Sequence, residues 1–120
     1  ERFPVDEIYG AHNIPGMPVG HIATREGGIM ASEDNFVIRI AGRGGHAARP
    51  HLAIDPLVVA AEIILALQSI VARAVDPAEP AVVSCTEIHS DGIRNALPTH
   101  VEIKGDTRSY SRQVQALLVS

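Results

Sequence analysis

Three stretches of the chain have the apolar patterns that are typical of strands. Residues 35–42 carry an apolar side chain at every second position on one face, and residues 100–108 alternate in the same way. Residues 81–88 are rich in β-branched side chains and predict a third strand. A shorter extended pattern at residues 22–25 indicates one further strand, followed by a turn at the neighbouring glycine pair.

A long helix is predicted between the strands at residues 35–42 and 81–88, from Pro56 to about Arg73. Asp55 is a good N-cap, and proline at the first helical position costs no hydrogen bond. The polar residues Glu62, Ser69 and Arg73 form one narrow stripe, so most of the circumference is apolar. Packing on one sheet uses only part of a helix surface, so we expect a second protein contact. A membrane span is disfavoured, because about 16 interrupted residues are too short.

Ser111 is expected to cap a second amphipathic helix, within which the chain ends. The element order is therefore β-α-β-β-α, which becomes a ferredoxin-like split β-α-β sandwich once a last, missing strand is added. The predicted fold class is α+β, with two helices on one face of an antiparallel sheet. Because the chain starts without Met and stops inside a helical pattern, we expect it to be a piece of a longer protein.

Composition narrows the class of protein. The 120 residues are 46% hydrophobic and 20% charged, which is typical of one globular domain. A formal charge of −4 and only 3% aromatic residues argue against a nucleic-acid partner. The single cysteine, Cys85, cannot form an internal disulfide, so we expect an intracellular, cytoplasmic protein.

Residues 41–56, AGRGGHAARPHLAIDP, place several glycines and two histidines between a strand and a helix. Glycines permit positive φ and a sharp exit from the strand, and they also let a backbone pass close to another group. In the second interpretation the loop presents the imidazole of His46, and the residues alone leave both interpretations open. The six histidines of the chain show no zinc-motif spacing, and no complete metal site can be assembled from them.

The same loop and the start of the helix, GRGGHAARPHLAIDPLVVAAEII, resemble the lid-domain signature of a family of metal-dependent amidohydrolases. This family includes hippurate hydrolase, aminoacylases, auxin-conjugate hydrolases and, more distantly, glutamate-releasing carboxypeptidases. Two further motifs, IRNALP and GDTRSYS, follow in the family's order, and YGAHNIPGMPVGHIATREGGIMAS precedes them. The resemblance therefore covers essentially the whole chain.

The resemblance implies a catalytic domain with one or two divalent metal ions, zinc or manganese, and an inserted ferredoxin-like lid. Residues 1–22 would then be the tail of the catalytic domain and the hinge, and residues 23–120 the truncated lid and dimerisation domain. In such enzymes a metal-bound water attacks the amide carbon of an N-acyl amino acid. The chain alone should be inactive and metal-free, because the family's Cys/His motif, paired glutamates and C-terminal histidine have no counterpart here.

The resemblance also implies roles for individual residues. His12 matches a metal ligand, and His46 matches a catalytic lid histidine that stabilises the oxyanion in the neighbouring subunit's active site. Asn95 and Arg108 match substrate-binding residues, the latter pairing with the substrate carboxylate. Without the resemblance, Asn95 is a turn residue and Arg108 a solvated charge at a strand end.

Two departures from the family pattern bear on substrate preference. Thr99 follows Pro98 where relatives often carry an acidic residue, and Arg94 precedes Asn95 where an apolar residue is frequent. We expect a homodimer through helix 55–73, the adjoining sheet edge, or both, and no membrane partner. The alternatives are a ferredoxin-like module that senses a small molecule or only dimerises, without catalysis, and an independent histidine-rich metal-binding domain.

Overall fold

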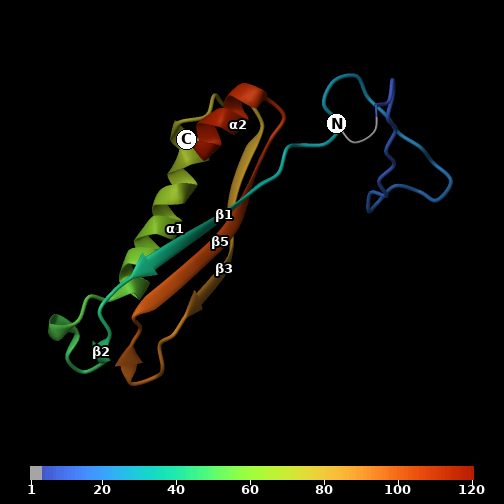
Figure 1. Cartoon of the computed structure of the whole chain (residues 1–120). Coiled ribbons are helices and arrows are strands. Elements are labelled where there is room, and N and C mark those ends of the chain that lie inside the picture. Colours follow the sequence, from blue (N-terminus) through green and yellow to red (C-terminus); the bar gives the residue numbers. More distant parts are fainter. Residues whose placement is uncertain (1–3) are drawn as a thin grey trace.

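The computed structural model describes residues 4–120 and contains three long strands, two α-helices and a small two-stranded ladder (Figure 1). The elements in chain order are β1 (Asp34–Ala41), β2 (Gly45–His46), a 3₁₀ turn (Pro50–Leu52), α1 (Pro56–Arg73), β3 (Ala81–Ser90), β4 (Ala96–Leu97), β5 (His100–Ser109) and α2 (Arg112–Val119).

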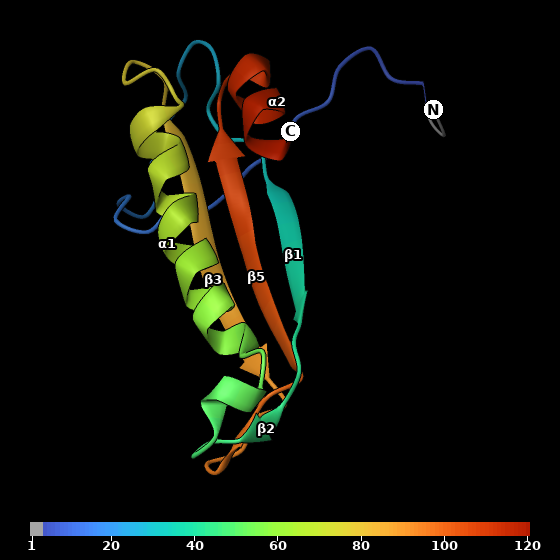
Figure 2. The same ribbon diagram turned by 90° about the vertical axis from the view of Figure 1, so that its left-hand side faces the viewer.

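The three long strands form one antiparallel sheet in the order β1-β5-β3. Helix α1 packs mainly on β3 and α2 packs on β5, both on the same face of the sheet (Figure 2). This arrangement confirms the predicted α+β class, with two helices on one face of an antiparallel sheet and the order β-α-β-β-α among the long elements.

The core lies between the central strand β5 and α1. Val101 and Ile103 of β5 are fully buried, and Ile103 lies opposite Ile38 of β1. Ala60 of α1 is also fully buried, and its small side chain lets the helix approach the sheet closely. Asp55 caps the helix as predicted, since its carboxylate accepts a hydrogen bond from the Leu57 amide at 2.9 Å.

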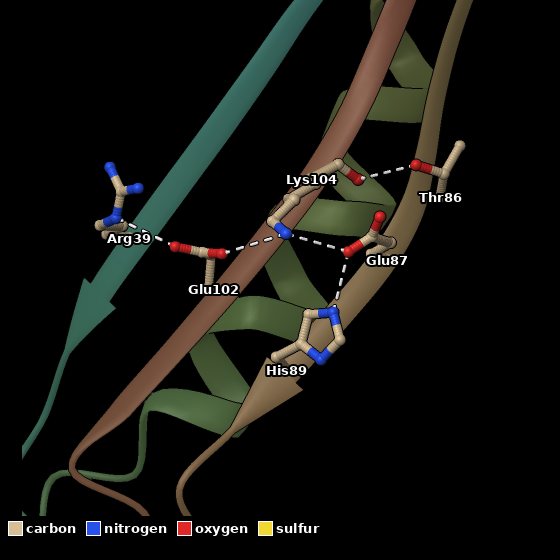
Figure 3. Close-up of polar contacts among 6 residues, drawn as sticks. All are labelled: Arg39, Thr86, Glu87, His89, Glu102 and Lys104. Carbon is tan, nitrogen blue, oxygen red and sulfur yellow. Dashed lines mark hydrogen bonds and ion pairs between the residues drawn. The ribbon is translucent and has the colours of Figure 1, made fainter.

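The face of the sheet that the helices do not cover carries a row of paired charges (Figure 3). Arg39 of β1 lies 3.0 Å from Glu102 of β5, and Lys104 of β5 lies 3.1 Å from Glu87 of β3. His89 lies 2.9 Å from the same Glu87 carboxylate, and these contacts with His89 and Lys104 lower the pKa of Glu87. Because these side chains pair with one another, this row of charges is satisfied within the domain.

The predicted strand at residues 22–25 is wrong. Residues 4–30 are exposed and form no strand, and the segment runs away from the sheet (Figure 1). A strand needs a partner for its backbone hydrogen bonds, and no described residue pairs with this one. The turn at the glycine pair is a bend in which Gly27 has a positive φ of 80°.

Strand β3 is longer than predicted, because it continues to Ser90. Its register shifts between Cys85 and Glu87, so one residue, Thr86, bulges out of the ladder with β5. The bulge reverses the alternation of the side chains that follow. This explains why the sequence of β3 shows no single in-out pattern over its whole length.

Candidate functional site

Two loops that are far apart in the sequence meet at one end of the sheet (Figure 2). Strands β2 and β4 pair so that Gly45 lies opposite Leu97 and His46 lies opposite Ala96. Just beyond this ladder, the Ala47 amide donates a hydrogen bond to the Asn95 carbonyl at 3.0 Å. The structure therefore brings His46 and Asn95 to neighbouring positions. We call residues 42–49 and 91–99 the paired loops.

Gly42 and Gly44 of the first loop are needed for close packing and not for positive φ. The described glycines with positive φ are Gly16, Gly20 and Gly27, so of the two interpretations left open by the sequence the structure supports close approach and not positive φ. A Cβ atom at Gly42 would collide with the Ile54 carbonyl and lie 2.6 Å from Cδ of Pro56, the first residue of α1. A Cβ atom at Gly44 would lie 2.8 Å from the Leu97 carbonyl oxygen.

Backbone hydrogen bonds fix the first loop at both of its ends. The Gly42 amide donates to the Thr99 carbonyl at 2.8 Å. Arg43 and Ile54 exchange two backbone hydrogen bonds of 2.9 Å each, which closes the loop before α1 begins. These hydrogen bonds hold the backbone on either side of His46. His51 lies in the same segment, and its side chain is exposed.

The hydrogen bonding of His46 determines which ring nitrogen carries a proton. Its Nδ1 accepts a hydrogen bond from the Ala48 amide at 3.1 Å, so Nδ1 carries no proton. In the neutral ring the proton is therefore on Nε2, and the ring offers an N–H donor away from its own backbone. The side chain is exposed, so this donor is accessible to a substrate or another subunit.

Asn95 fits both of its predicted interpretations. Its backbone forms part of the turn and accepts the hydrogen bond from Ala47, which makes it a turn residue. Its side chain is exposed beside the ladder that carries His46, so a substrate could reach the amide group.

Arg108 lies at the opposite end of β5 from the paired loops. It lies eight positions after His100, which corresponds to about 27 Å along an antiparallel strand. Its guanidinium contacts Asp106 at 2.5 Å and Glu33, the residue before β1, at 3.0 Å. The hydrogen bond to Asp106 raises the pKa of Arg108. Arg108 is therefore a paired cation, and the structure does not bring it together with His46 and Asn95.

His12 lies in the exposed N-terminal segment, where its Nδ1 is 2.8 Å from the Asn13 carbonyl oxygen. A carbonyl oxygen can only accept, so Nδ1 carries a proton, and in the neutral ring Nε2 has a free lone pair. Metal-binding histidines commonly have this arrangement. Within residues 4–120, however, no three His, Cys, Asp or Glu side chains come together. The described residues therefore do not fit a complete metal site.

The structure reveals one further well-connected residue, Asp91, at the base of the second loop. Its carboxylate accepts hydrogen bonds from the Thr99 hydroxyl and from the amides of Thr99 and His100. These bonds, the Thr99 hydroxyl first among them, lower the pKa of Asp91 to about 2. The sequence does not single out Asp91. The sequence pattern contains no signal that the acceptor and its donors, eight and nine residues apart, would meet.

Helix α1 carries an exposed apolar surface on the side that faces away from the sheet. Leu65 is 72% exposed and Val58 is 56% exposed, and Leu57 and Val59 adjoin them. We call these four residues the α1 apolar surface. The predicted reason against a membrane span, that the segment is too short, is wrong, because α1 has 18 residues and is, among the described helices, the one long and apolar enough to cross a membrane by length and composition. However, the buried Pro56 and Ala60 show that one side of it is packed in a domain.

Comparison with known sequences identifies relatives that are hydrolases. The model of the peptidase dimerisation domain family matches residues 34–117. N-acetylcysteine deacetylase of Bacillus subtilis is 41% identical over 111 residues, which are 92% of this chain and 29% of that protein. Thermostable carboxypeptidase 2 of Saccharolobus solfataricus is 41% identical over 112 residues, 93% of this chain and 28% of that protein. The chain thus spans less than a third of the length of these relatives.

Solved structures with the same fold support this relationship. A protein from methicillin-resistant Staphylococcus aureus, assigned as an aminohydrolase, has a TM-score of 0.75 and 32% identity over 79% of this chain and 25% of that chain. The YXEP protein of Bacillus subtilis, a dinuclear metal binding peptidase of the M20 family, has a TM-score of 0.57 and 33% identity over 88% of this chain and 24% of that chain. The chain described here belongs to the peptidase dimerisation domain family of the M20 peptidases.

Proposed function

We propose that the full-length protein is a metal-dependent hydrolase that cleaves the amide bond of N-acyl amino acids, and that this chain is its lid and dimerisation domain. The observation that carries the proposal is the orientation of His46, which offers an Nε2–H donor at an exposed position beside Asn95. The relatives named as deacetylases and carboxypeptidases support the same reaction class.

The proposed role of His46 is to stabilise the oxyanion that forms when water adds to the amide carbonyl. Such a donor must be held in place before the charge develops, because reorienting it during the reaction would cost free energy. The Ala48 amide fixes the ring through Nδ1, and the β2–β4 ladder fixes the backbone. Asn95, held on the neighbouring strand end, contributes a second polar group to the same substrate.

The paired loops of one subunit would complete the active site of its partner, while Arg108 serves the site of its own subunit. The distance of about 27 Å along β5 is several times the size of an N-acyl amino acid, so the two groups cannot contact one substrate in the same place. Arg108 is the proposed partner of the substrate carboxylate. Because Glu33 contacts the same guanidinium, Glu33 would compete with the substrate carboxylate for Arg108.

The α1 apolar surface is the proposed dimer contact, together with the free edge of β3. Strand β3 lies at the edge of the sheet, next to α1, and Val82 and Ile88 on it are half exposed. Burying apolar surface of this kind stabilises association. Leu65→Lys should therefore shift the full-length protein toward monomer in sedimentation velocity. Val119→Lys, at the end of α2, is the matched control and should leave a dimer. A wild-type protein that is strictly monomeric at high micromolar concentration would contradict the contact.

The metal ions, proposed to be zinc or manganese, would be held mainly by residues of the full-length protein outside this chain. His12 is the one residue proposed here to contribute a ligand, through the free Nε2 described above. Elemental analysis of the purified full-length protein tests the identity of the metal. His12→Ala should lower the bound metal, while the exposed His21→Ala should not.

A substrate screen tests the proposed reaction. Full-length protein should hydrolyse members of a panel of N-acetyl, N-benzoyl and longer N-acyl amino acids. His46→Ala should lower kcat by about 10²- to 10³-fold with little change in KM, because an oxyanion contact exists mainly in the transition state. An unchanged kcat would contradict the role of His46. Tight binding of amino acids without hydrolysis would instead support a sensing module.

A further inference from the structure

We propose that Asp91 is a positioning residue for this hydrolysis, holding both paired loops in the arrangement that His46 and Asn95 require. The inference rests on the proposed function. Asp91 does not contact the substrate in this account. It acts through Thr99, the last residue of the second loop, which contacts the first loop.

The Asp91 carboxylate closes the base of the second loop. Its Oδ1 accepts the amide hydrogens of Thr99 and His100, each at 2.9 Å, and its Oδ2 accepts the Thr99 hydroxyl hydrogen. All three donors lie at or next to the start of β5. The loop that leaves the sheet at Asp91 is therefore tied to the point where it returns.

Within this closed loop a second, smaller closure forms around Asn95. Ile93 and Ala96 exchange backbone hydrogen bonds of 3.2 and 3.0 Å. Asn95 lies between these two residues, so its position depends on the base of the loop that Asp91 holds together.

Thr99 transmits the same restraint to the loop of His46. Its carbonyl accepts the Gly42 amide hydrogen at 2.8 Å. Its methyl carbon Cγ2 packs against Gly44, since a Cβ atom built there would lie only 3.0 Å away. Thr99 thus contacts the first loop at two points, just before His46, while the Asp91 carboxylate fixes its amide and its hydroxyl.

The contacts of Asp91 are exposed, so water can replace them when the carboxylate is removed. The sheet and its core do not depend on them. We therefore expect removal to loosen the paired loops without unfolding the domain, and loosened catalytic groups lower kcat more than they raise KM.

The test compares two substitutions at Asp91 in the full-length enzyme. Asp91→Ala removes all three acceptor contacts and should lower kcat by about ten- to a hundredfold. Asp91→Asn keeps Oδ1 for both amides, and its NH₂ can donate to the Thr99 hydroxyl oxygen, so it should retain most of the activity. The matched control is Asp76→Ala, which removes a similar hydrogen bond to the Ala78 amide at the opposite end of the sheet and should leave kcat unchanged.

Two further measurements separate positioning from a general structural role. The double variant Asp91→Ala/His46→Ala should lose less activity than the product of the two single losses, because Asp91 acts partly through His46. Amide hydrogen exchange should accelerate in residues 42–49 and 91–99 of Asp91→Ala, but not in those of Asp76→Ala. If Asp91→Ala does not fold, the hydroxyl-deleting Thr99→Val replaces it in the same comparisons, with a smaller loss of kcat.

The outcomes distinguish this inference from the proposed function. If His46→Ala is impaired but the kcat of Asp91→Ala is within twofold of wild type, the positioning role of Asp91 is overturned and the proposed function stands. Multiplicative losses in the double variant also overturn it. An Asp91→Asn variant as slow as Asp91→Ala would show that the charge itself acts, which likewise contradicts a role through hydrogen bonds. If the wild-type enzyme has no hydrolytic activity, the proposed function itself is refuted.

Discussion

Substituting the two adjacent glycines before His46 with alanine should have opposite consequences. Gly44 faces the Leu97 carbonyl oxygen and Thr99, whereas Gly45 faces only the Cβ atom of Ala53. Neither glycine has positive φ, so alanine brings no backbone strain at either position. The comparison therefore isolates the space available for one methyl group.

The magnitude follows from the distances. At Gly44 the new Cβ would lie 2.8 Å from the Leu97 oxygen, about 0.6 Å short of the 3.4 Å at which ordinary contact begins. The obstacle is backbone within the β2–β4 ladder, so the loop itself must move. A misplacement of 1 Å can lower a rate by about 100-fold, so we expect about a tenfold loss of kcat and a destabilisation of about 1–3 kcal/mol. At Gly45 the distance to Ala53 is 3.3 Å, which a slight shift relieves.

The assay is steady-state hydrolysis of the best N-acyl amino acid, together with thermal unfolding of each full-length variant. Gly44→Ala should lose kcat and melt at a lower temperature. Gly45→Ala should keep its kcat and gain up to about 1 kcal/mol, because alanine restricts the unfolded chain. Equal losses for the two variants, or a Gly44→Ala variant with wild-type kcat and Tm, would refute the close-packing explanation of this loop.

Three other predictions concern stability, pH and substrate affinity. Gly105→Ala should destabilise the domain by about 1–3 kcal/mol in denaturant unfolding, because its Cβ would collide with the Ser84 carbonyl oxygen and with the Phe36 ring; a neutral effect would contradict the packing. The pKa of Asp91 falls from 3.8 to about 2 on folding, so its stabilising effect is complete above pH 3.8 and lost as the pH falls to about 2. The Tm difference between wild type and Asp91→Asn should shrink over that range, and a constant difference would contradict the lowered pKa of the Asp91 carboxylate in the folded protein. Glu33→Gln should lower KM by freeing Arg108 for the substrate carboxylate, and a raised KM would show that the pair instead orients Arg108.

The sequence was sufficient for the long elements, because each carries its own local signal. Asp55 and Ser111 cap the two helices through side-chain hydrogen bonds to backbone amides, as predicted from their positions. The strand predicted at residues 22–25 shows the limit of such signals, since an extended pattern does not reveal whether a partner strand exists.

The candidate site was less predictable, because it depends on contacts between distant segments. Strands of two residues, such as β2 and β4, have no periodicity to detect. The proximity of His46 and Asn95 follows from their pairing and not from any spacing in the sequence. Gly44 shows the same limit, because the group that requires a glycine there is the Leu97 carbonyl, more than fifty residues away in the sequence. The resemblance to the amidohydrolases supplied the candidate residues, and the fold supplied their grouping.

The most direct test of the central claim, that His46 completes the active site of the partner subunit, uses mixed dimers. Full-length His12→Ala and His46→Ala chains are co-expressed with different affinity tags, and dimers that contain one of each are isolated. Each parent homodimer should be nearly inactive. The mixed dimer has one site with intact His12 and the partner's intact His46, so it should recover about half of the wild-type kcat per dimer. A mixed dimer as inactive as its parents would show that His46 serves its own subunit and would contradict the account.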